Sequence, residues 1–506
     1  PGSHADPLSG RVLRSDFEHA LLDGPVRGNA QASYFLHDVP HLQADGSTIR
    51  LRWRRVDPLA EVRPRKDHAQ VRSADRDLQI ERHHAARSAR GVRSPFAPAG
   101  DQPGAIASCV RLLRDERRRF ACLRGATGTG KTFVMANVIA ERAPDRPTLV
   151  VVPNKTLAAQ VARELRGYLP SHRVELFVSH FSLYVPESFS RGRYVEKRSA
   201  IDHDLDALRH RATKALVEAD NVVVVASVSC LYGLGVPADY VDARLVLQPD
   251  RPVEGGAYAV ARRLRDELLY EENADGGAEG LRPGQWAWDA ASSRGEENTS
   301  PKIPEKRLVV WPPYEDRALA LDLAEDGALL AVVPLDPNRA RDPRAAAAAP
   351  PPPPPARFTV WPRQHHITPP DRLRVALAAI RAELKAACAS LRAEAKHAEA
   401  DRLEQRTNAD VELLRELGWC PGAEHYSRHL GGRAPGQAPV TLLDYMAFEP
   451  SGGEVNDART PRREWLLVAD ESHVMLPQLR AMHGGDRSRK LGLVAGGYRL
   501  PSALDN

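Results

Sequence analysis

Residues 125–132 have the types and spacing that bind a nucleotide phosphate. They read Gly125-Ala-Thr-Gly-Thr-Gly-Lys-Thr132, which fits the pattern G-x-x-x-x-G-K-[ST]. In such a loop, glycines let backbone N–H groups surround a polyphosphate, the lysine reaches the β- and γ-phosphates, and the hydroxyl binds Mg²⁺. The predicted nucleotide-binding residues of the loop are Gly125, Ala126, Thr127, Gly128, Thr129, Gly130, Lys131 and Thr132.

The elements on either side of this loop must position it. Arg119-Phe-Ala-Cys-Leu123 is typical of a short buried strand, and Lys131–Ala140 is typical of a helix with an apolar face. A strand, a glycine-rich loop and a helix in this order favour a nucleotide site over the alternative, a simple turn between two elements.

Two adjacent acids follow an apolar run far downstream. Trp465–Ala469 predicts a strand, and Asp470 and Glu471 come directly after it. Asp470 would hold a metal ion together with Thr132, and Glu471 would orient and deprotonate an attacking water. We therefore predict Lys131, Asp470 and Glu471 as catalytic. An exposed turn is the alternative for the acids alone, and His473 either senses the nucleotide or packs.

Gln102 precedes the lysine by about 29 residues. Its amide carries both a donor and an acceptor, the combination that an adenine edge can meet. A helix-capping turn around Asp101 and Pro103 explains the same residues equally well.

Residues 179–197 interleave aromatic and basic side chains. Base-stacking rings in such segments are each worth ~1–3 kcal/mol. Ser190-Arg-Gly-Arg193 is typical of a hairpin tip. The predicted DNA-binding residues are Phe181, Tyr184, Phe189, Arg191, Arg193, Tyr194 and Lys197. The alternative is a surface hairpin whose rings pack inward.

Composition limits the other classes of function. The chain has 506 residues and a net charge of +5, an excess too small to establish nucleic-acid binding by itself. The sequence contains no apolar run of 18 residues, so it predicts no membrane span. Five widely spaced cysteines make zinc and a disulfide framework unexpected and suit the reducing cytoplasm.

The pattern of elements divides the chain. Residues 1–94 lack sustained periodicity and are expected to be a basic, disordered extension. Apolar runs at 148–152, 174–178, 221–226 and 465–469 then alternate with helical patterns, which predicts an α/β fold with a parallel sheet. A small β module is expected over 245–345, an Ala/Pro linker over 346–356 and a helical subdomain over 357–430.

With these pieces in place, the chain resembles the UvrB family of bacterial nucleotide excision repair from about residue 94 to 506. Besides the phosphate loop, the resemblance rests on Pro153–Gln160, Ala226–Gly235, Leu403–Thr407, Tyr426–Leu430, Asp470–Val474 and Leu500–Asn506.

The resemblance implies an ATP- and Mg²⁺-dependent, superfamily-2 helicase-type protein that verifies damaged double-stranded DNA. Gln102 would sense adenine, and residues 179–197 would be the hairpin that slides between the strands. A RecA-like lobe would comprise 95–244 and 431–506, and 245–345 would contact a UvrA-like protein. A UvrC-like nuclease would be recruited.

The chain also departs from the family pattern. Its hairpin is two residues shorter, His180 and Leu183 replace tyrosines, and extra residues lie at 449–463. The second motor lobe is missing after Asn506, so we expect weak ATP binding and little hydrolysis by this piece. The alternative functions are a transcription–repair coupling translocase and a docking module without motor activity. The alternative compartment to the cytoplasm is an organelle.

Overall fold

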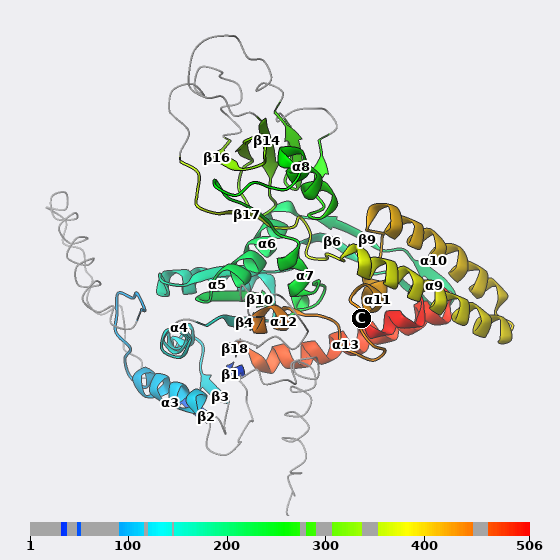
Figure 1. Cartoon of the computed structure of the whole chain (residues 1–506). Coiled ribbons are helices and arrows are strands. Elements are labelled where there is room, and N and C mark those ends of the chain that lie inside the picture. The colour runs from blue at the N-terminus through cyan, green and yellow to red at the C-terminus, as the bar shows by residue number, and fades with distance from the viewer. Residues whose placement is uncertain are drawn as a thin grey trace, which may run out of the picture. The chain divides into compact units, whose positions relative to one another are not determined.

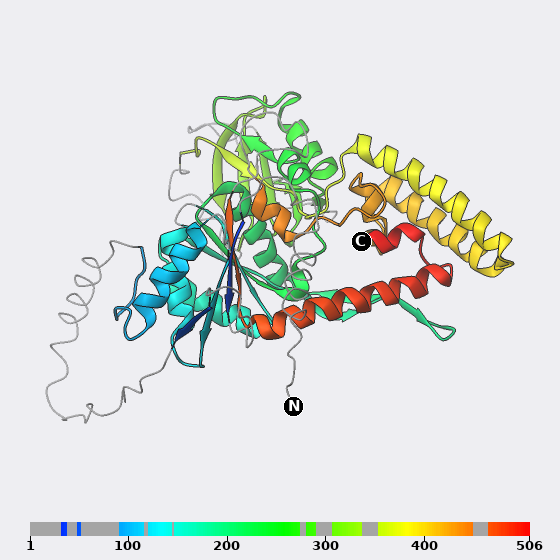
Figure 2. The ribbon, with the colours of Figure 1, turned by 90° about the horizontal axis from the view of Figure 1, so that it is seen from below.

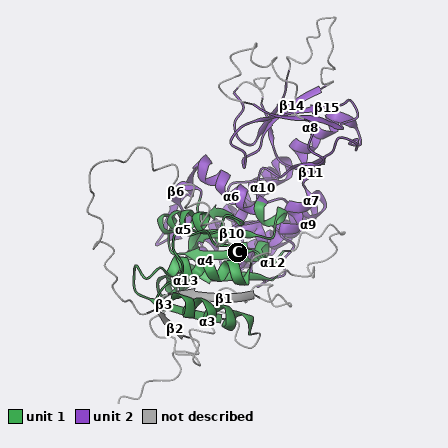
Figure 3. Ribbon diagram, turned by 90° about the vertical axis from the view of Figure 1, so that its left-hand side faces the viewer, with its two compact units in different colours: residues 1–179, 215–232, 442–489 green, residues 180–214, 233–441, 490–506 purple. Residues whose placement is uncertain are grey.

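The computed structural model describes residues 32–37, 48–51, 91–115, 120–143, 146–273, 280–289, 306–335, 353–448 and 464–506. They form two compact units, each assembled from several stretches of chain (Figure 3). Unit 1 draws its described residues from 1–179, 215–232 and 442–489, and unit 2 from 180–214, 233–441 and 490–506.

A parallel sheet forms the centre of unit 1. Within the described residues it has seven strands in the order β2-β3-β1-β18-β4-β10-β5 (Figure 1). The strands are β1 (Ala32–His37), β2 (Thr48–Leu51), β3 (Phe120–Gly125), β4 (Thr148–Val152), β5 (Arg173–Phe177), β10 (Val222–Ser227) and β18 (Trp465–Ala469). β4, β10 and β18 are buried along their whole length, as continuous apolar runs require. This sheet confirms the predicted α/β class.

One helix of unit 1 begins at a side-chain cap, and another begins after a left-handed glycine. α4 (Lys131–Arg142) starts after Gly130, and at the start of α5 (Lys155–Tyr168) the side chain of Asn154 accepts a 2.9 Å hydrogen bond from the Leu157 amide. The others are α3 (Gln102–Arg114), the 3₁₀ turn η3 (Val228–Cys230), α12 (Leu442–Ala447) and most of α13 (Ser472–Ala495).

Two strands come from the N-terminal segment for which we expect disorder. β1 pairs with both β3 and β18, and β2 pairs with β3, all in parallel. The expectation is therefore wrong for these ten positions, because backbone pairing to neighbouring strands can fix a short segment that shows no periodicity of its own. The remainder of residues 1–90 lies outside the described part of the chain.

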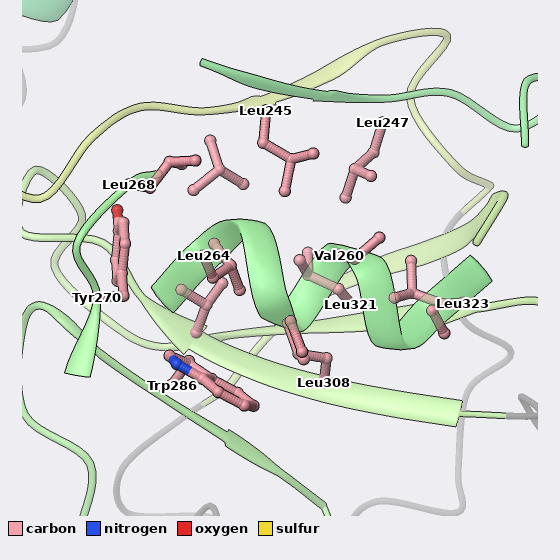
Figure 4. Packing of buried hydrophobic residues seen from close by; sticks show 14 of the residues in the cluster. Leu245, Leu247, Val260, Leu264, Leu268, Tyr270, Trp286, Leu308, Leu321 and Leu323 are labelled. Atoms are coloured by element: carbon pink, nitrogen blue, oxygen red, sulfur yellow. The ribbon is translucent and has the colours of Figure 1, made fainter. Parts of the chain in front are cut away.

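A small β module occupies part of unit 2. In the described residues its sheet has the order β12-β13-β14-β15-β16, and β11 pairs with β17 beside it. Helix α8 (Gly256–Asp266) lies between them: Figure 4 shows Val260 and Leu264 between Leu245 and Leu247 on one side and Trp286 on the other. The elements are β11 (Leu245–Leu247), β12 (Glu271–Glu272), β13 (Gln285–Trp288), β14 (Lys306–Trp311), β15 (Leu319–Leu323), β16 (Leu329–Pro334) and β17 (Phe358–Val360).

An antiparallel helix pair forms another part of unit 2. α9 (Pro370–Ala393) and α10 (His397–Leu417) lie side by side (Figure 2), and α10 ends at Gly418, whose φ of 67° suits glycine. Short helices follow: η5 (Ala423–Tyr426), α11 (Ser427–Leu430) and η6 (Pro501–Asp505). Leu500 packs in the core of this pair. Residues 490–506 thus group with the helices, whereas we expect them in the nucleotide-binding lobe.

Two short antiparallel ribbons and two further helices complete unit 2. β6 (Phe181–Val185) pairs with β9 (Arg198–Ile201), and β7 (Ser188–Ser190) pairs with β8 (Arg193–Val195). α6 (His203–Glu218) and α7 (Pro237–Asp242) follow in the chain, and the end of α6 belongs to unit 1.

Several expected segments lie outside the described residues. They include 290–305, most of the expected Ala/Pro linker and the extra residues 449–463. Among the helices that the structure describes, none is long and apolar enough to cross a membrane.

Candidate nucleotide and nucleic-acid sites

The phosphate loop turns on two glycines between β3 and α4. Gly128 and Gly130 have φ values of 80° and 77°, in the left-handed region that side chains disfavour. The Thr129 amide and hydroxyl both donate to the Ala126 carbonyl, at 3.3 and 2.8 Å. These bonds close the loop over the N-terminus of α4, where backbone amides and the helix dipole attract anions.

Gln102 supports this loop from α3. Its amide nitrogen donates to the Thr129 carbonyl at 3.0 Å, and its amide oxygen accepts from the Ala99 backbone at 3.1 Å. A Cβ on Gly130 would lie 2.5 Å from the Gln102 nitrogen, so the contact depends on glycine. Gln102 thus lies beside the loop and is hydrogen-bonded to it.

Lys131 and Thr132 occupy the first turn of α4. The Lys131 ammonium donates to the carbonyls of Gly125 and Ala126, at 3.0 and 3.3 Å. It therefore lies across the loop itself. Thr132 is half-buried next to it.

Asp470 and Glu471 stand where β18 ends and α13 begins. Asp470 is 6% exposed; its amide continues the ladder to the Val151 carbonyl at 2.9 Å, and its Oδ1 accepts from the Glu471 amide at 3.0 Å. Glu471 has φ of 48°, an unusual value for a residue with a side chain. Its carboxylate lies 3.4 Å from Nδ1 of His473, which is partly exposed.

The two halves of the candidate site share one sheet edge. β3 leads into the loop and β18 leads into Asp470, and only β1 separates them in the described sheet. Because all three strands are parallel, their carboxyl ends lie at the same edge, about 10 Å apart across two strand spacings. That distance suits a polyphosphate and a metal ion between the two ends.

The side chains at this edge fit a nucleotide with a hard divalent cation. A hydroxyl and a carboxylate are the oxygen ligands that Mg²⁺ prefers, with phosphates and water completing its shell. No cluster of three His, Cys, Asp or Glu suited to a metal occurs in the part of the chain that the structure describes.

The ribbon β6–β9 exposes two of the predicted DNA-binding rings. A register shift between Phe181 and Leu183 places Phe181 and Tyr184 on one face, although they are three residues apart. Their rings stack at 4.9 Å, and Tyr184 is 49% exposed. Leu183 and Ile201 are about equally exposed. This ribbon presents apolar surface to solvent.

The ribbon β7–β8 has a different environment. Its turn uses Arg191 and Gly192, both at positive φ, as a two-residue hairpin turn requires. The Tyr194 ring stacks on Tyr498 at 4.2 Å, and Phe189 meets the same ring at 5.0 Å. Phe189 and Tyr194 therefore pack against protein, as the alternative interpretation of this segment holds.

A buried carboxylate anchors that ribbon. Glu187, 1% exposed, accepts from Arg499 at 2.9 Å and from the Tyr194 hydroxyl at 2.7 Å. His425 lies 3.3 Å from it. Burial raises the pKa of Glu187, but the hydrogen bond from His425 and the charge of Arg499 outweigh it and hold that pKa below its usual range.

No local sequence pattern predicts this network or the contact that Tyr498 makes. Arg499 also pairs with Asp410 at 3.0 Å, and Arg406 donates to the Tyr194 hydroxyl at 2.8 Å. The only signal was the position of these residues next to the motif blocks 403–407, 426–430 and 500–506.

The predicted DNA-binding residues thus fall into separate groups. Phe181 and Tyr184 share one ribbon, while Phe189 and Tyr194 pack on Tyr498. Lys197 forms an ion pair with Glu424. Arg191 and Arg193 are exposed at the hairpin tip.

Two family profiles match this chain. The family described as "Type III restriction enzyme, res subunit" matches residues 95–224, and the one described as "UvrB third helical domain" matches residues 371–432. Together with the parallel sheet, these matches confirm the predicted fold class, a RecA-like superfamily-2 helicase lobe with an inserted helical subdomain.

Curated relatives extend the similarity over most of the chain. UvrABC system protein B of Cyanothece sp. is 41% identical over 419 residues, which is 82% of this chain and 55% of the relative. The proteins of the same name from Nostoc sp. and Prochlorococcus marinus are 40% and 39% identical over 418 and 417 residues. The chain spans about half the length of the curated relatives it matches. Over 82% of its length, this chain is therefore related to the UvrABC system protein B family.

Proposed function

We propose that this chain provides the ATP-binding and DNA-holding part of a damage-verification protein in nucleotide excision repair. The observation that carries the proposal is the sheet edge shared by the phosphate loop after β3 and the acids after β18. The relation to UvrABC system protein B supports this pathway, since those relatives belong by name to the UvrABC system.

We assign ATP and Mg²⁺ to this edge. The loop amides and Lys131 would hold the phosphates, and Thr132 and Asp470 would hold the cation. Gln102 would contact the adenine edge while keeping the loop in place. The bound cation supplies positive charge that offsets the charge on the phosphates.

Glu471 is the candidate general base for water. Its left-handed backbone places it at the start of α13, next to the buried Asp470. A strained conformation held by surrounding hydrogen bonds fixes a carboxylate in one position, which a base needs in order to reach its proton.

DNA binding is proposed for the exposed ribbon in unit 2. Phe181 and Tyr184 form a stacked pair with one exposed ring, and Leu183 and Ile201 add aliphatic surface. Such a ribbon suits contact with unstacked bases of damaged double-stranded DNA. Arg191 and Arg193 would meet phosphates. UvrA-like and UvrC-like proteins are the proposed partners, and the cytoplasm the proposed compartment.

A loading assay tests this function. Duplex DNA with one bulky lesion is incubated with this chain, a bacterial UvrA and ATP, and the complex that remains after UvrA leaves is measured by gel mobility. We expect Lys131→Ala to reduce the retained complex by about tenfold or more, because the lysine contacts the phosphates.

The matched control is Lys385→Ala, at an exposed lysine on α9. It should load as well as the parent chain. Equal loading by Lys131→Ala would contradict the proposal and favour a docking module that works without nucleotide.

A further inference from the structure

Four aromatic rings form a buried column in unit 2 that the proposed function does not use. His210 of α6 and His365 stack at 4.1 Å with an interplanar angle of 20°, and both are almost fully buried. The Tyr240 ring of α7 continues the stack at 6.3 Å from His365, and Trp361 lies 5.5 Å beyond Tyr240. The column therefore crosses α6, α7 and the segment that follows β17.

This column connects two parts of unit 2. At one end, Asp206 of α6 lies 3.6 Å from His210 and 3.5 Å from His180, the residue just before β6. At the other end, the Trp361 carbonyl accepts from the Tyr270 hydroxyl at 2.9 Å, and its amide donates to the Tyr314 hydroxyl at 2.9 Å. Tyr270 belongs to the core of the small β module. The base of the exposed ribbon and this module are thus joined through the rings.

The surroundings of His365 are tightly packed. A Cβ on Gly235 would overlap the His365 carbonyl oxygen, and Nε2 of His366 lies 2.9 Å from the Gly233 carbonyl. Nε2 of His365 lies 3.2 Å from the Thr213 hydroxyl. The backbone of segment 361–366 is therefore closely packed at His365 and His366.

The charged and titratable groups that face His365 oppose a positive charge on it. They are Arg209 and His210 on α6, His180 before β6 and the adjacent His366. The Tyr240 ring on α7 also faces His365. The nearby carboxylate, Asp206, lies 3.6 Å from Nε2 of His210. Burial lowers the pKa of His365 well below its usual range, and the neighbouring His210 lowers it further.

We propose that His365 is the joint that holds the ribbon base and the small β module in one arrangement, and that acid opens this joint. A proton on His365 would place a positive charge against the His210 ring in a buried site. The charged form is therefore accommodated only when segment 361–366 moves away from α6 and α7. A group that is neutral when folded and protonated when released favours the open state as the pH falls below its ordinary value of 6.5.

Hydrogen exchange on the unmodified chain tests the joint without nucleotide or DNA, so its failure is distinct from a failure of the proposed function. We expect the amides of residues 358–366 to exchange about tenfold faster at about pH 5.5 than at about pH 7.5, after correction for the intrinsic rate. His365→Phe keeps an aromatic ring but cannot titrate, so it should remove this difference. His473→Phe, at a partly exposed histidine of unit 1, is the matched control and should keep it.

An equal pH response in His365→Phe would overturn the proposal. Should that variant fail to fold, NMR titration of the unmodified chain decides: the His365 ring should gain no proton while the amides of 358–366 stay protected. A protonated His365 with full protection would overturn the proposal as well. Gly235→Ala would displace the His365 backbone by steric overlap at any pH. It should therefore raise the exchange of the amides of 358–366 at both pH values.

Discussion

The amide nitrogen of Gln102 donates a 3.0 Å hydrogen bond to the carbonyl oxygen of Thr129, inside the phosphate loop. Because the other end of this side chain is held by the Ala99 backbone, Gln102 connects the segment before α3 to the loop before α4. A base bound beside Gln102 and a phosphate bound in the loop would thus contact one connected structure.

Gln102→Ala should weaken nucleotide binding by about tenfold, since it removes the base contact and one support of the loop. Titration with a fluorescent ATP analogue measures the effect. Gln160→Ala, at an exposed glutamine of α5, is the control and should bind normally. Normal binding by Gln102→Ala would contradict a role of the glutamine in nucleotide binding.

Arg499→Ala should destabilise unit 2 strongly. It removes one of the two arginines that lie 2.9 Å from the buried Glu187 carboxylate and leaves only Arg406, and breaking a buried pair costs at most about 3–5 kcal/mol. Urea unfolding followed by far-UV circular dichroism measures the change. Arg381→Ala removes an exposed ion pair on α9 and should leave the midpoint nearly unchanged. Similar midpoints for both variants would refute the anchoring role of Glu187.

Acid should weaken the same anchor. The folded-state pKa of Glu187 lies below its ordinary value of 4.5, so its contribution is complete above that value and is lost as the pH falls toward the folded pKa. Glu187→Gln should therefore show a flatter loss of stability than the parent chain below about pH 4.5. Thermal unfolding at several pH values measures this. The exposed Glu412→Gln should keep the parent slope, and a parallel slope in Glu187→Gln would contradict the assignment.

Tyr184 and Tyr194 should differ in what their removal costs. Tyr184→Ala loses an exposed ring, so we expect DNA retention to fall by ~1–3 kcal/mol with an unchanged unfolding midpoint. Tyr194→Ala loses the stack on Tyr498 and the bond to Glu187, so its unfolding midpoint should drop. Gel mobility and urea unfolding of both variants separate the two roles. A lower midpoint for Tyr184→Ala would make that ring part of the core.

The sequence predicts those parts of the fold that local pattern determines. β4 and β18 have the predicted bounds, because continuous β-branched and aliphatic runs suit strands buried on both faces. The hairpin turn at Gly192 follows from the glycine, whereas the positive φ of Arg191 does not follow from its residue type. The phosphate loop and the acids after β18 were found by spacing alone, and their common edge follows from parallel pairing.

Contacts between residues far apart in the sequence cannot be predicted from local patterns. Tyr194 and Tyr498 are about 300 residues apart, and no periodicity indicates that their rings stack. The grouping of residues 490–506 with the helix pair depends on Leu500 and Arg499 finding partners in α10 and the ribbon. β1 and β2 likewise depend on a long-range contact, since their pairing with β3 defines them as strands.

Metal-dependent ATP binding tests the central claim most directly. Mn²⁺ replaces Mg²⁺ in an electron paramagnetic resonance titration, with and without ATP, in the parent chain and in Asp470→Asn. We predict that ATP and Mn²⁺ bind together to the parent chain, and that Asp470→Asn weakens the metal by about tenfold or more while the fold is kept. Equal Mn²⁺ binding in both proteins would contradict a site shared by the phosphate loop and Asp470.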